Sequence, residues 1–289
     1  MQPFEVRIMR ESDLPGADEL RQLVGWNQLI QDWRRLLRLE PEGCFVAVEE
    51  GAITGTVTTT CYGRTLAWIG MMLVHPGQRR KGIGTVLMRT ALQHLRSAGV
   101  QCVRLDATPA GRPLYEKLGF VEEWDLRRWQ RATTPEPPKQ EEISSVTRPL
   151  RPDDWPEIER LDTAAFGTAR IELLQSLAAS SLSALVLPGA NANGVRGWGL
   201  LRPGRNADYL GPLQCHTAED CLALSTALLR SVPDRPVFWD FPELNIPARK
   251  TAQGLGFEPV RPLTRMRFGP LVCRSEPLRQ FGIADPAVG

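Results

Sequence analysis

Apolar and polar residues alternate along the first 130 residues in an order that predicts a sheet covered by helices. Short β-branched or alternating stretches predict strands, and apolar residues that recur every three or four positions predict amphipathic helices. Strands are expected over residues 5–9, 43–48, 53–60, 68–74, 103–106 and 121–129. Helices are expected after Ser12 or Asp13, which cap the first one, and over residues 28–39, 82–98 and 111–118. Glu50-Gly51 predicts a hairpin turn, and the whole order predicts a mixed sheet with helices on both faces.

The same pattern occurs twice. Residues 10–20 read Arg-x-x-Asp-x-Pro-x-x-x-x-Leu, and residues 151–161 repeat this pattern at an offset of 141. At that offset Trp68-Ile69-Gly70 matches Tyr209-Leu210-Gly211 and His75 matches His216, and Leu-Gly-Phe occurs at 118–120 and again at 255–257. Several matches in one register predict two copies of one fold. We expect domains at residues 1–131 and 146–270, a proline-rich charged linker at 132–145 and a tail at 271–289.

Composition narrows the class of protein. The 289 residues suit two domains of ordinary size. A net charge of +2, with 24% charged residues, gives no indication of a surface that binds nucleic acid or membranes. No apolar run approaches the ~18 residues that a membrane span needs, and the first residues lack the features of a signal peptide. The six cysteines form no Cys-x-x-Cys pair, which favours buried, reduced thiols. We expect a cytoplasmic protein without a metal.

The candidate chemistry lies in residues 74–85, which read Val-His-Pro-Gly-Gln-Arg-Arg-Lys-Gly-Ile-Gly-Thr. An apolar stretch precedes this segment and an amphipathic one follows it, so it is a basic, glycine-containing loop between a strand and a helix. Backbone N–H groups at a helix start attract anions, and glycine lets a ligand approach the backbone closely. The loop therefore predicts a binding site for a phosphate-bearing ligand.

Two other glycine loops are excluded by spacing. A P-loop needs Gly-Lys followed by Ser or Thr, and a dinucleotide fingerprint needs a small residue where Leu87 stands. The remaining pattern, Arg79-x-x-Gly82-x-Gly84, resembles the acetyl-CoA loop of the GNAT N-acetyltransferase superfamily. Further along, residues 108–120 read Thr-x-x-Gly-x-x-Leu-Tyr-Glu-Lys-Leu-Gly-Phe and are similar to the GNAT signature Asn-x-x-Ala-x-x-Leu-Tyr-x-x-x-Gly-Phe. Thr108 and Gly111 depart from it, which leaves open the side-chain contact to pantetheine.

The resemblance implies a fold, a co-substrate and a set of residues. The fold class is α/β (α+β): two tandem GNAT folds, each a mixed, mostly antiparallel sheet flanked by helices on both faces. Acetyl-CoA is the implied co-substrate, with its pantetheine arm paired along the strand that ends at Val74 and its pyrophosphate on the loop amides. The implied cofactor-binding residues are Met72, Leu73, Val74, Gln78, Arg79, Arg80, Lys81, Gly82, Ile83, Gly84, Thr85 and Thr108.

Tyr115 is implied by the motif to be the general acid that protonates the leaving thiolate, although its position alone favours a core aromatic on an amphipathic helix. The base stays unassigned. Asp106 ends a strand, but Asp240 ends the corresponding strand of the second copy, so a structural role is at least as well supported. His75 has the partner His216 in a copy without the loop, which also favours a structural role.

The second copy is interpreted as degenerate. Carried through at the offset of 141, the register places Ala223 and Ser225 where the loop has its glycines, and Asp220 where it has Arg79. The Leu-Gly-Phe alignment places Ala252 at the position of Tyr115, while the pair Asn245-x-x-Ala248 survives. We therefore expect no CoA to bind there in the usual way.

The acceptor site is expected between the first two helices, as in GNAT proteins, with the second copy closing one side. Two indole rings with an amide and a carboxylate suit a cationic amine, although Trp26 and Trp33 equally fit one packing stripe. The candidate substrate-binding residues are Trp26, Asn27, Asp32, Trp33 and Tyr62.

These features predict an N-acetyltransferase that acts on the primary amine of a small molecule by direct attack. The alternatives are a protein lysine or N-terminal acetyltransferase, and a non-catalytic sensor of acyl-CoA. Because a tandem chain already supplies the pairing of a dimer, a monomer with an internal pseudo-dimer is expected.

Overall fold

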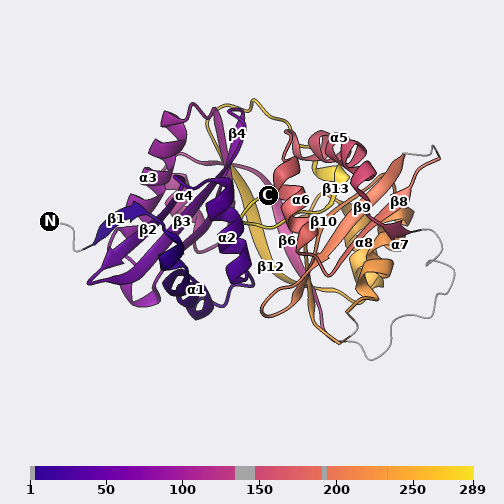
Figure 1. Ribbon diagram of the computed structural model, residues 1–289, viewed down its shortest axis with the longest axis horizontal. Coiled ribbons are helices and arrows are strands. Elements are labelled where there is room, and N and C mark those ends of the chain that lie inside the picture. Colours follow the sequence, from indigo (N-terminus) through magenta and orange to yellow (C-terminus); the bar gives the residue numbers. More distant parts are fainter. Residues whose placement is uncertain (1–3, 134–146, 191–193, 233) are drawn as a thin grey trace. The chain divides into compact units, whose positions relative to one another are not determined.

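The computed structural model describes residues 4–133, 147–190, 194–232 and 234–289, which form two compact units (Figure 1). Unit 1 contains the chain up to Glu123 together with Arg265–Cys273 and Pro286–Val288. Unit 2 contains Trp124–Thr264, Arg274–Asp285 and Gly289. The units are therefore not sequential, and the domain boundaries expected from the repeat do not coincide with them.

Unit 1 has the order of elements that the apolar pattern predicts, with each boundary within a few residues. Its helices are α1 (Leu14–Leu23), α2 (Ile30–Leu39), α3 (Ile83–Ser97) and α4 (Arg112–Lys117). Its strands are β1 (Glu5–Ile8), β2 (Cys44–Glu49), β3 (Ala52–Tyr62), β4 (Leu66–Val74), β5 (Cys102–Ala107) and the start of β6 (Val121–Arg131). The expected hairpin turn is present, since Glu50 and Gly51 both have positive φ, at 49° and 82°.

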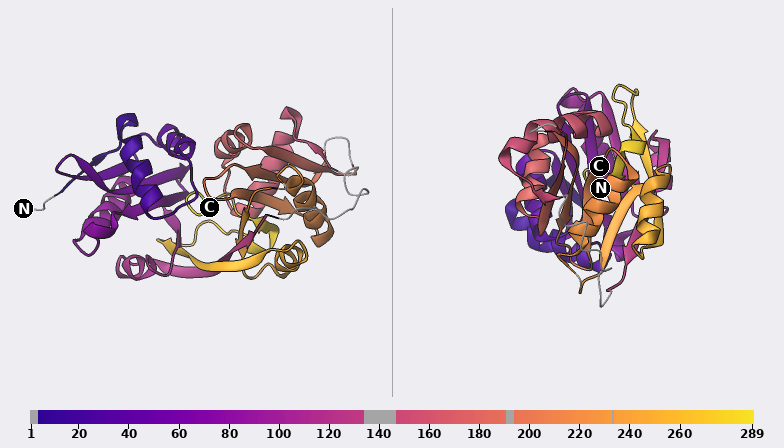
Figure 2. Two further views of the ribbon diagram at one scale, coloured as in Figure 1. Left: turned by 90° about the horizontal axis from the view of Figure 1, so that it is seen from below. Right: turned by 90° about the vertical axis from the view of Figure 1, so that its right-hand side faces the viewer.

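The sheet of unit 1 has the order β1-β2-β3-β4-β5. Its first four strands pair antiparallel, and β4 pairs parallel with β5. Helix α3 buries Ile83, Leu87 and Ala91 in one apolar core against β4 side chains such as Ile69. Because side chains alternate along a strand, Trp68 and Gly70 lie on the opposite face, which α1 and α2 cover (Figure 2).

Unit 2 repeats this plan. Its helices are α5 (Trp155–Phe166), α6 (Ile171–Ala179), α7 (Ala218–Leu229) and α8 (Ile246–Gly254). Its strands are β7 (Arg148–Pro149), β8 (Ser183–Pro188), β9 (Val195–Arg202), β10 (Asp208–Cys215), β11 (Val237–Pro242), most of β12 (Glu258–Phe268) and β13 (Gln280–Gly282). Strand β10 pairs antiparallel with β9 and parallel with β11, as β4 does with β3 and β5.

The two repeats exchange their last strands. From Trp124 onward β6, the last strand of the first repeat, belongs to unit 2 and pairs antiparallel with β11 from Leu126 to Arg131. From Arg265 onward β12, the last strand of the second repeat, belongs to unit 1 and neighbours β5. Each unit is thus completed by a strand from the other repeat.

Each exchanged strand brings an arginine to the aspartate at the end of the neighbouring strand. Arg265 binds Asp106 in unit 1 through two hydrogen bonds of 2.8 and 2.9 Å, and neither side chain is exposed. Arg128 binds Asp240 in unit 2 in the same way, at 2.8 and 2.6 Å. Because the repeats share this pairing, the buried ion pairs belong to the fold.

The repeated Arg-x-x-Asp pattern is also structural. The Asp13 carboxylate accepts two hydrogen bonds from Arg7, at 2.7 and 2.8 Å, and one from the N–H of Arg10 at 2.7 Å. These bonds hold the pKa of Asp13 below its usual value, although burial opposes the shift. Asp154 has the same partners in unit 2, in Arg148 and the N–H of Arg151.

All six cysteines are free and five of them are buried, which confirms the reduced thiols expected from the sequence. Burial raises the pKa of both Cys44 and Cys61 to about 12. Within the described ranges no helix is long and apolar enough to cross a membrane.

Candidate functional site

The loop between β4 and α3 forms a cradle of backbone amides in unit 1. After the short 3₁₀ turn Pro76–Gln78, Arg80 and Gly82 both adopt positive φ, at 66° and 87°. Alternation of left-handed and ordinary residues turns successive N–H groups toward one side, the geometry of an anion-binding nest. Gly82 is the N-cap of α3, so the nest leads directly into the start of a helix of 15 residues.

The first amides of α3 are available to an anion. The first intrahelical hydrogen bond runs from the N–H of Val86 to the carbonyl of Gly82 at 3.1 Å, so the N–H groups of Ile83, Gly84 and Thr85 precede the ladder. The helix macrodipole adds favourable potential there, and the three loop residues 79–81 are all basic and exposed. This donor set fits a pyrophosphate.

The two loop glycines have different roles. A Cβ on Gly82 would meet no atom within 4 Å, so Gly82 is required by its positive φ and not by a lack of space. A Cβ on Gly84 would lie 3.1 Å from Met72 Cε and 3.3 Å from Leu114 Cδ2. The small size of Gly84 therefore also lets α3 pack closely on β4 and α4.

Strand β4 contains a bulge and then leaves its parallel neighbour. Pairing with β5 covers Leu66, Ala67 and Trp68. Beyond Trp68 the register with β3 shifts at Met71, whose φ is 46° and whose carbonyl accepts a hydrogen bond from Thr56 Oγ1 at 2.7 Å. Met72, Leu73 and Val74, the residues that the GNAT resemblance assigns to the pantetheine arm, follow this bulge where β4 diverges from β5.

Thr108 lies before α4, and Tyr115 lies within this helix. The Tyr115 side chain is 8% exposed, and its ring packs on Phe120 with centroids 6.0 Å apart. Burial raises the pKa of Tyr115 well above its usual value, which keeps the hydroxyl protonated. Thr108 Oγ1 accepts a hydrogen bond from the N–H of Gly111 at 3.2 Å, so Thr108 caps the turn into α4.

The candidate bases have structural partners. The Asp106 carboxylate is fully buried in its pair with Arg265, and Asp240 has the equivalent pair. His75 Nδ1 accepts a hydrogen bond from the N–H of Gly77 at 3.2 Å, which caps the turn before the cradle. These contacts favour the structural role for both residues.

Most of the residues expected to bind the acceptor are buried or have hydrogen-bond partners within the protein. Trp33 is fully buried and Asn27 is 7% exposed. The Asp32 carboxylate accepts hydrogen bonds from the N–H of Leu29 at 2.7 Å and from Arg35 at 2.5 Å, so it caps α2 and its charge is already neutralised. Trp26 lies just before α2, and Tyr62, at the end of β3, is 5% exposed.

In unit 2 the cradle is deleted rather than substituted. The segment between β4 and α3 covers residues 75–82, whereas the one between β10 and α7 contains only His216 and Thr217. The offset of 141 is therefore lost at this point, and Ala223 and Ser225 lie inside α7, so the alignment of these two residues with Gly82 and Gly84 is wrong. The N–H of Asp220 donates to Thr217 Oγ1 at 3.1 Å, which caps the start of α7.

A segment of the chain's own tail lies where β10 diverges from β11. Strand β13 pairs antiparallel with β10, with Gln280 opposite Gln214 and Gly282 opposite Leu213. The side-chain amide of Asn245 donates to the carbonyls of Leu278 and Gln280 at 3.2 and 3.0 Å. The tail thus fills the place in unit 2 that corresponds to the divergence of β4 and β5 in unit 1.

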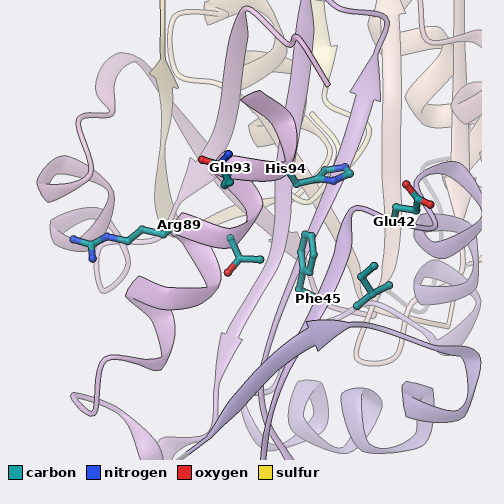
Figure 3. A pocket seen from close by; sticks show the side chains of 7 residues that line it. Glu42, Phe45, Arg89, Gln93 and His94 are labelled. Carbon is teal, nitrogen blue, oxygen red and sulfur yellow. The ribbon is translucent and has the colours of Figure 1, made fainter. Parts of the chain in front are cut away.

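A surface pocket of about 570 Å³ lies beside the second half of α3. Figure 3 shows Arg89, Gln93 and His94 of α3 around it, with Phe45 and Glu42 on the other side. The His94 and Phe45 rings meet edge to face with centroids 5.7 Å apart. None of the residues expected in the cradle or the acceptor site lines this pocket.

Comparisons with known proteins agree with this geometry. Residues 9–120 match the model of the acetyltransferase (GNAT) family, and residues 158–281 match the model of an acetyltransferase (GNAT) domain. A holothin acyltransferase from Pseudoalteromonas sp. (strain SANK 73390) is 26% identical over 248 residues, which are 84% of this chain and 81% of that protein.

A glucosamine 6-phosphate N-acetyltransferase from Trypanosoma brucei brucei is 31% identical over 131 residues, covering 40% of this chain and 88% of that protein. A solved structure, a candidate acetyltransferase from Pyrococcus horikoshii, has a TM-score of 0.84 at 24% identity and covers 100% of this chain and 97% of its own. The expected fold class, two tandem GNAT folds, is confirmed.

Proposed function

Since the chain belongs to the GNAT family of acetyltransferases, we propose that unit 1 alone transfers an acetyl group from acetyl-CoA to the primary amine of a small molecule. The single observation that carries this proposal is the intact cradle at Gln78–Thr85, in a chain whose second repeat has lost that loop. Acyl transfer is the activity of the family, whereas the acceptor and the roles of individual residues are our inference.

The reaction proceeds by direct attack. The neutral amine nitrogen attacks the thioester carbonyl, so that a C–N bond forms and the C–S bond breaks. Strand β4 diverges from β5 before it reaches Val74. Backbone N–H groups of β4 near Val74 stabilise the oxyanion. The Tyr115 hydroxyl donates its proton to the departing thiolate and regains one from water, which takes up the proton that the amine releases.

A small amine is favoured over a protein side chain by the character of the acceptor face. Of the residues expected there, Asn27, Trp33 and Tyr62 are buried, which leaves them little surface for an extended peptide. Two similar proteins are named after small-molecule substrates, the holothin acyltransferase and the glucosamine 6-phosphate N-acetyltransferase. The alternatives are a protein acetyltransferase and an acyl-CoA sensor. A screen of small amines distinguishes the proposed function from both, because neither alternative transfers acetyl to a small amine.

The cradle is tested by the variant Gly82→Ala. A left-handed residue with a Cβ is strained by about 1–2 kcal/mol, and the methyl group would enter the open space beside the amides. We expect the affinity for acetyl-CoA, measured by calorimetric titration, to fall about 10-fold or more, since 1.4 kcal/mol is a factor of ten.

Gly99→Ala is the matched control for this variant. Gly99 follows the other end of α3 and also has positive φ, at 75°, so it carries a similar strain away from the cradle. Its affinity for acetyl-CoA should equal that of the wild type. Equal losses in the two variants would show that strain, and not the cradle, controls binding.

A further inference from the structure

The last residues of the tail lie on the face of β4 that is opposite α3. Trp68 Nε1 donates a hydrogen bond to the carbonyl of Pro286 at 3.0 Å, and Tyr62 Oη donates one to the carbonyl of Val288 at 2.7 Å. The residue between these two carbonyls, Ala287, is 6% exposed. The segment Pro286–Val288, which we call the tail loop, therefore belongs to unit 1, with Ala287 and Val288 buried there.

Gly70 is the residue against which the tail loop packs. A Cβ on Gly70 would lie 2.2 Å from the carbonyl oxygen of Ala287 and 2.8 Å from its Cα, so only glycine permits this contact. Gly70 immediately precedes the bulge at Met71, where β4 diverges from β5. The tail loop thus lies at the closed end of that divergence.

Unit 2 shows what an extended segment does in the equivalent place. Strand β13 lies along β10, with Gln280 opposite Gln214 and Gly282 opposite Leu213. The next residue, Ile283, reaches Gly211, where a Cβ would lie 2.2 Å from the Ile283 carbonyl oxygen. A segment that runs along β10 toward the part of β10 that pairs with β11 therefore reaches Gly211.

The same path in unit 1 leads to the tail loop. At the offset of 141, Gln214, Leu213 and Gly211 correspond to Leu73, Met72 and Gly70. A pantetheine arm whose pyrophosphate lies on the cradle runs from Val74 back toward Met72, so its thioester end points at Gly70. Ala287 already stands there.

From this geometry we infer that the tail loop limits the length of the acyl chain and restricts the donor to acetyl-CoA. This inference rests on the proposed function of unit 1. Ala287 and Val288 are the residues that determine donor specificity, because their buried backbone and side chain occupy the space that additional methylene groups would need. Overpacking such a site costs free energy, since buried atoms cannot yield without moving their neighbours.

The contacts of the tail loop within unit 1 fix its backbone. Trp68 and Tyr62 donate hydrogen bonds to two of its carbonyls, and Ala287 packs on Gly70 between them.

The test is calorimetric titration with CoA, acetyl-CoA and butyryl-CoA, which needs no acceptor amine. The full chain should bind butyryl-CoA at least about 10-fold more weakly than acetyl-CoA, since one methylene that does not fit changes recognition by about 10- to 200-fold. A chain truncated after Asp285 should lose this difference and still bind CoA with unchanged affinity. Tyr62→Phe, which removes one anchor of the tail loop, should reduce the difference about threefold, close to the loss of one hydrogen bond.

Arg279→Ala is the matched control, because Arg279 pairs with Glu276 on the exposed part of the same tail and should leave the discrimination intact. If the truncated chain does not bind CoA, Tyr62→Phe decides the question. Equal affinity of the full chain for acetyl-CoA and butyryl-CoA would overturn the inference and leave the proposed function standing. A full chain that binds none of the three ligands would refute both.

Discussion

The variant Tyr115→Phe should lower kcat by about 10²- to 10³-fold, the usual contribution of a positioned general acid. The affinity for acetyl-CoA should change little, because the cradle amides lie on a different element from the phenol. The reason for the large effect is the missing proton donor, since phenylalanine has no hydroxyl to protonate the departing thiolate. Steady-state kinetics with an amine found by screening gives kcat, and calorimetry gives the affinity.

The raised pKa also predicts a pH profile. A group whose pKa lies above its usual value of 10 stays protonated through that pH, so deprotonation of Tyr115 should cause no loss of kcat below pH 10. Tyr209→Phe is the matched control, since Tyr209 is a buried tyrosine of unit 2 that donates to Asp240 at 3.1 Å. It should retain kcat. A kcat for Tyr115→Phe within about twofold of the wild type would leave Tyr115 a packing role alone, since removal of a working acid costs far more.

Asp106→Ala should lower the free energy of unfolding by about 3–5 kcal/mol, because it leaves the Arg265 guanidinium buried without its carboxylate partner. Neither residue of this pair is exposed, so water cannot replace the lost interaction. The double variant Asp106→Ala with Arg265→Met should recover much of the loss, since it removes both charges. Chemical denaturation of the three variants measures these differences.

The control for this prediction is a surface pair. Arg112 and Glu116 are 42% and 46% exposed, and Arg112→Ala should cost at most about 1 kcal/mol. The Asp106→Ala variant should also keep measurable turnover under conditions in which it stays folded, because Asp106 holds the exchanged strand β12 through Arg265 and takes no part in the reaction. A stable Asp106→Ala variant without turnover would instead identify Asp106 as the catalytic base.

Most of unit 1 could be predicted from the sequence because local signals determine it. The strand and helix periods, the Glu50-Gly51 turn and the basic glycine loop are each encoded within a few residues. The cradle was found for the same reason, since positive φ at Gly82 and an amphipathic helix after it leave a local signature. The catalytic role of Tyr115 stays a prediction that rests on its motif alone, because a buried tyrosine on a helix otherwise indicates packing.

The strand exchange could not be predicted, because it depends on a choice between equivalent partners. Val121–Arg131 and Glu258–Phe268 have the same pattern whichever repeat they complete, and Arg128 or Arg265 would match either aspartate. The loss of the second cradle was predicted for the wrong reason. The offset of 141 holds only up to His216, because the loop that follows is shorter in the second repeat. Beyond a deletion, an alignment at one fixed offset pairs residues that do not correspond, so the deletion is mistaken for substitutions.

The acceptor residues were the weakest prediction, since a carboxylate three residues after a helix start serves as a cap as readily as a ligand. Asp32 does so here, with Leu29 and Arg35 as partners. The role of Gly70 was missed for a related reason. Its contact, the carbonyl of Ala287, is distant in sequence, and the tail that provides it has no periodic pattern.

The proposed function requires that this tandem chain has one acetyl-CoA site, in the cradle of unit 1. Calorimetric titration of the intact chain with acetyl-CoA measures the number of sites directly. We predict one site per chain, which Gly82→Ala weakens and Gly99→Ala leaves unchanged. Two sites per chain, or one site that does not respond to Gly82→Ala, would contradict the account.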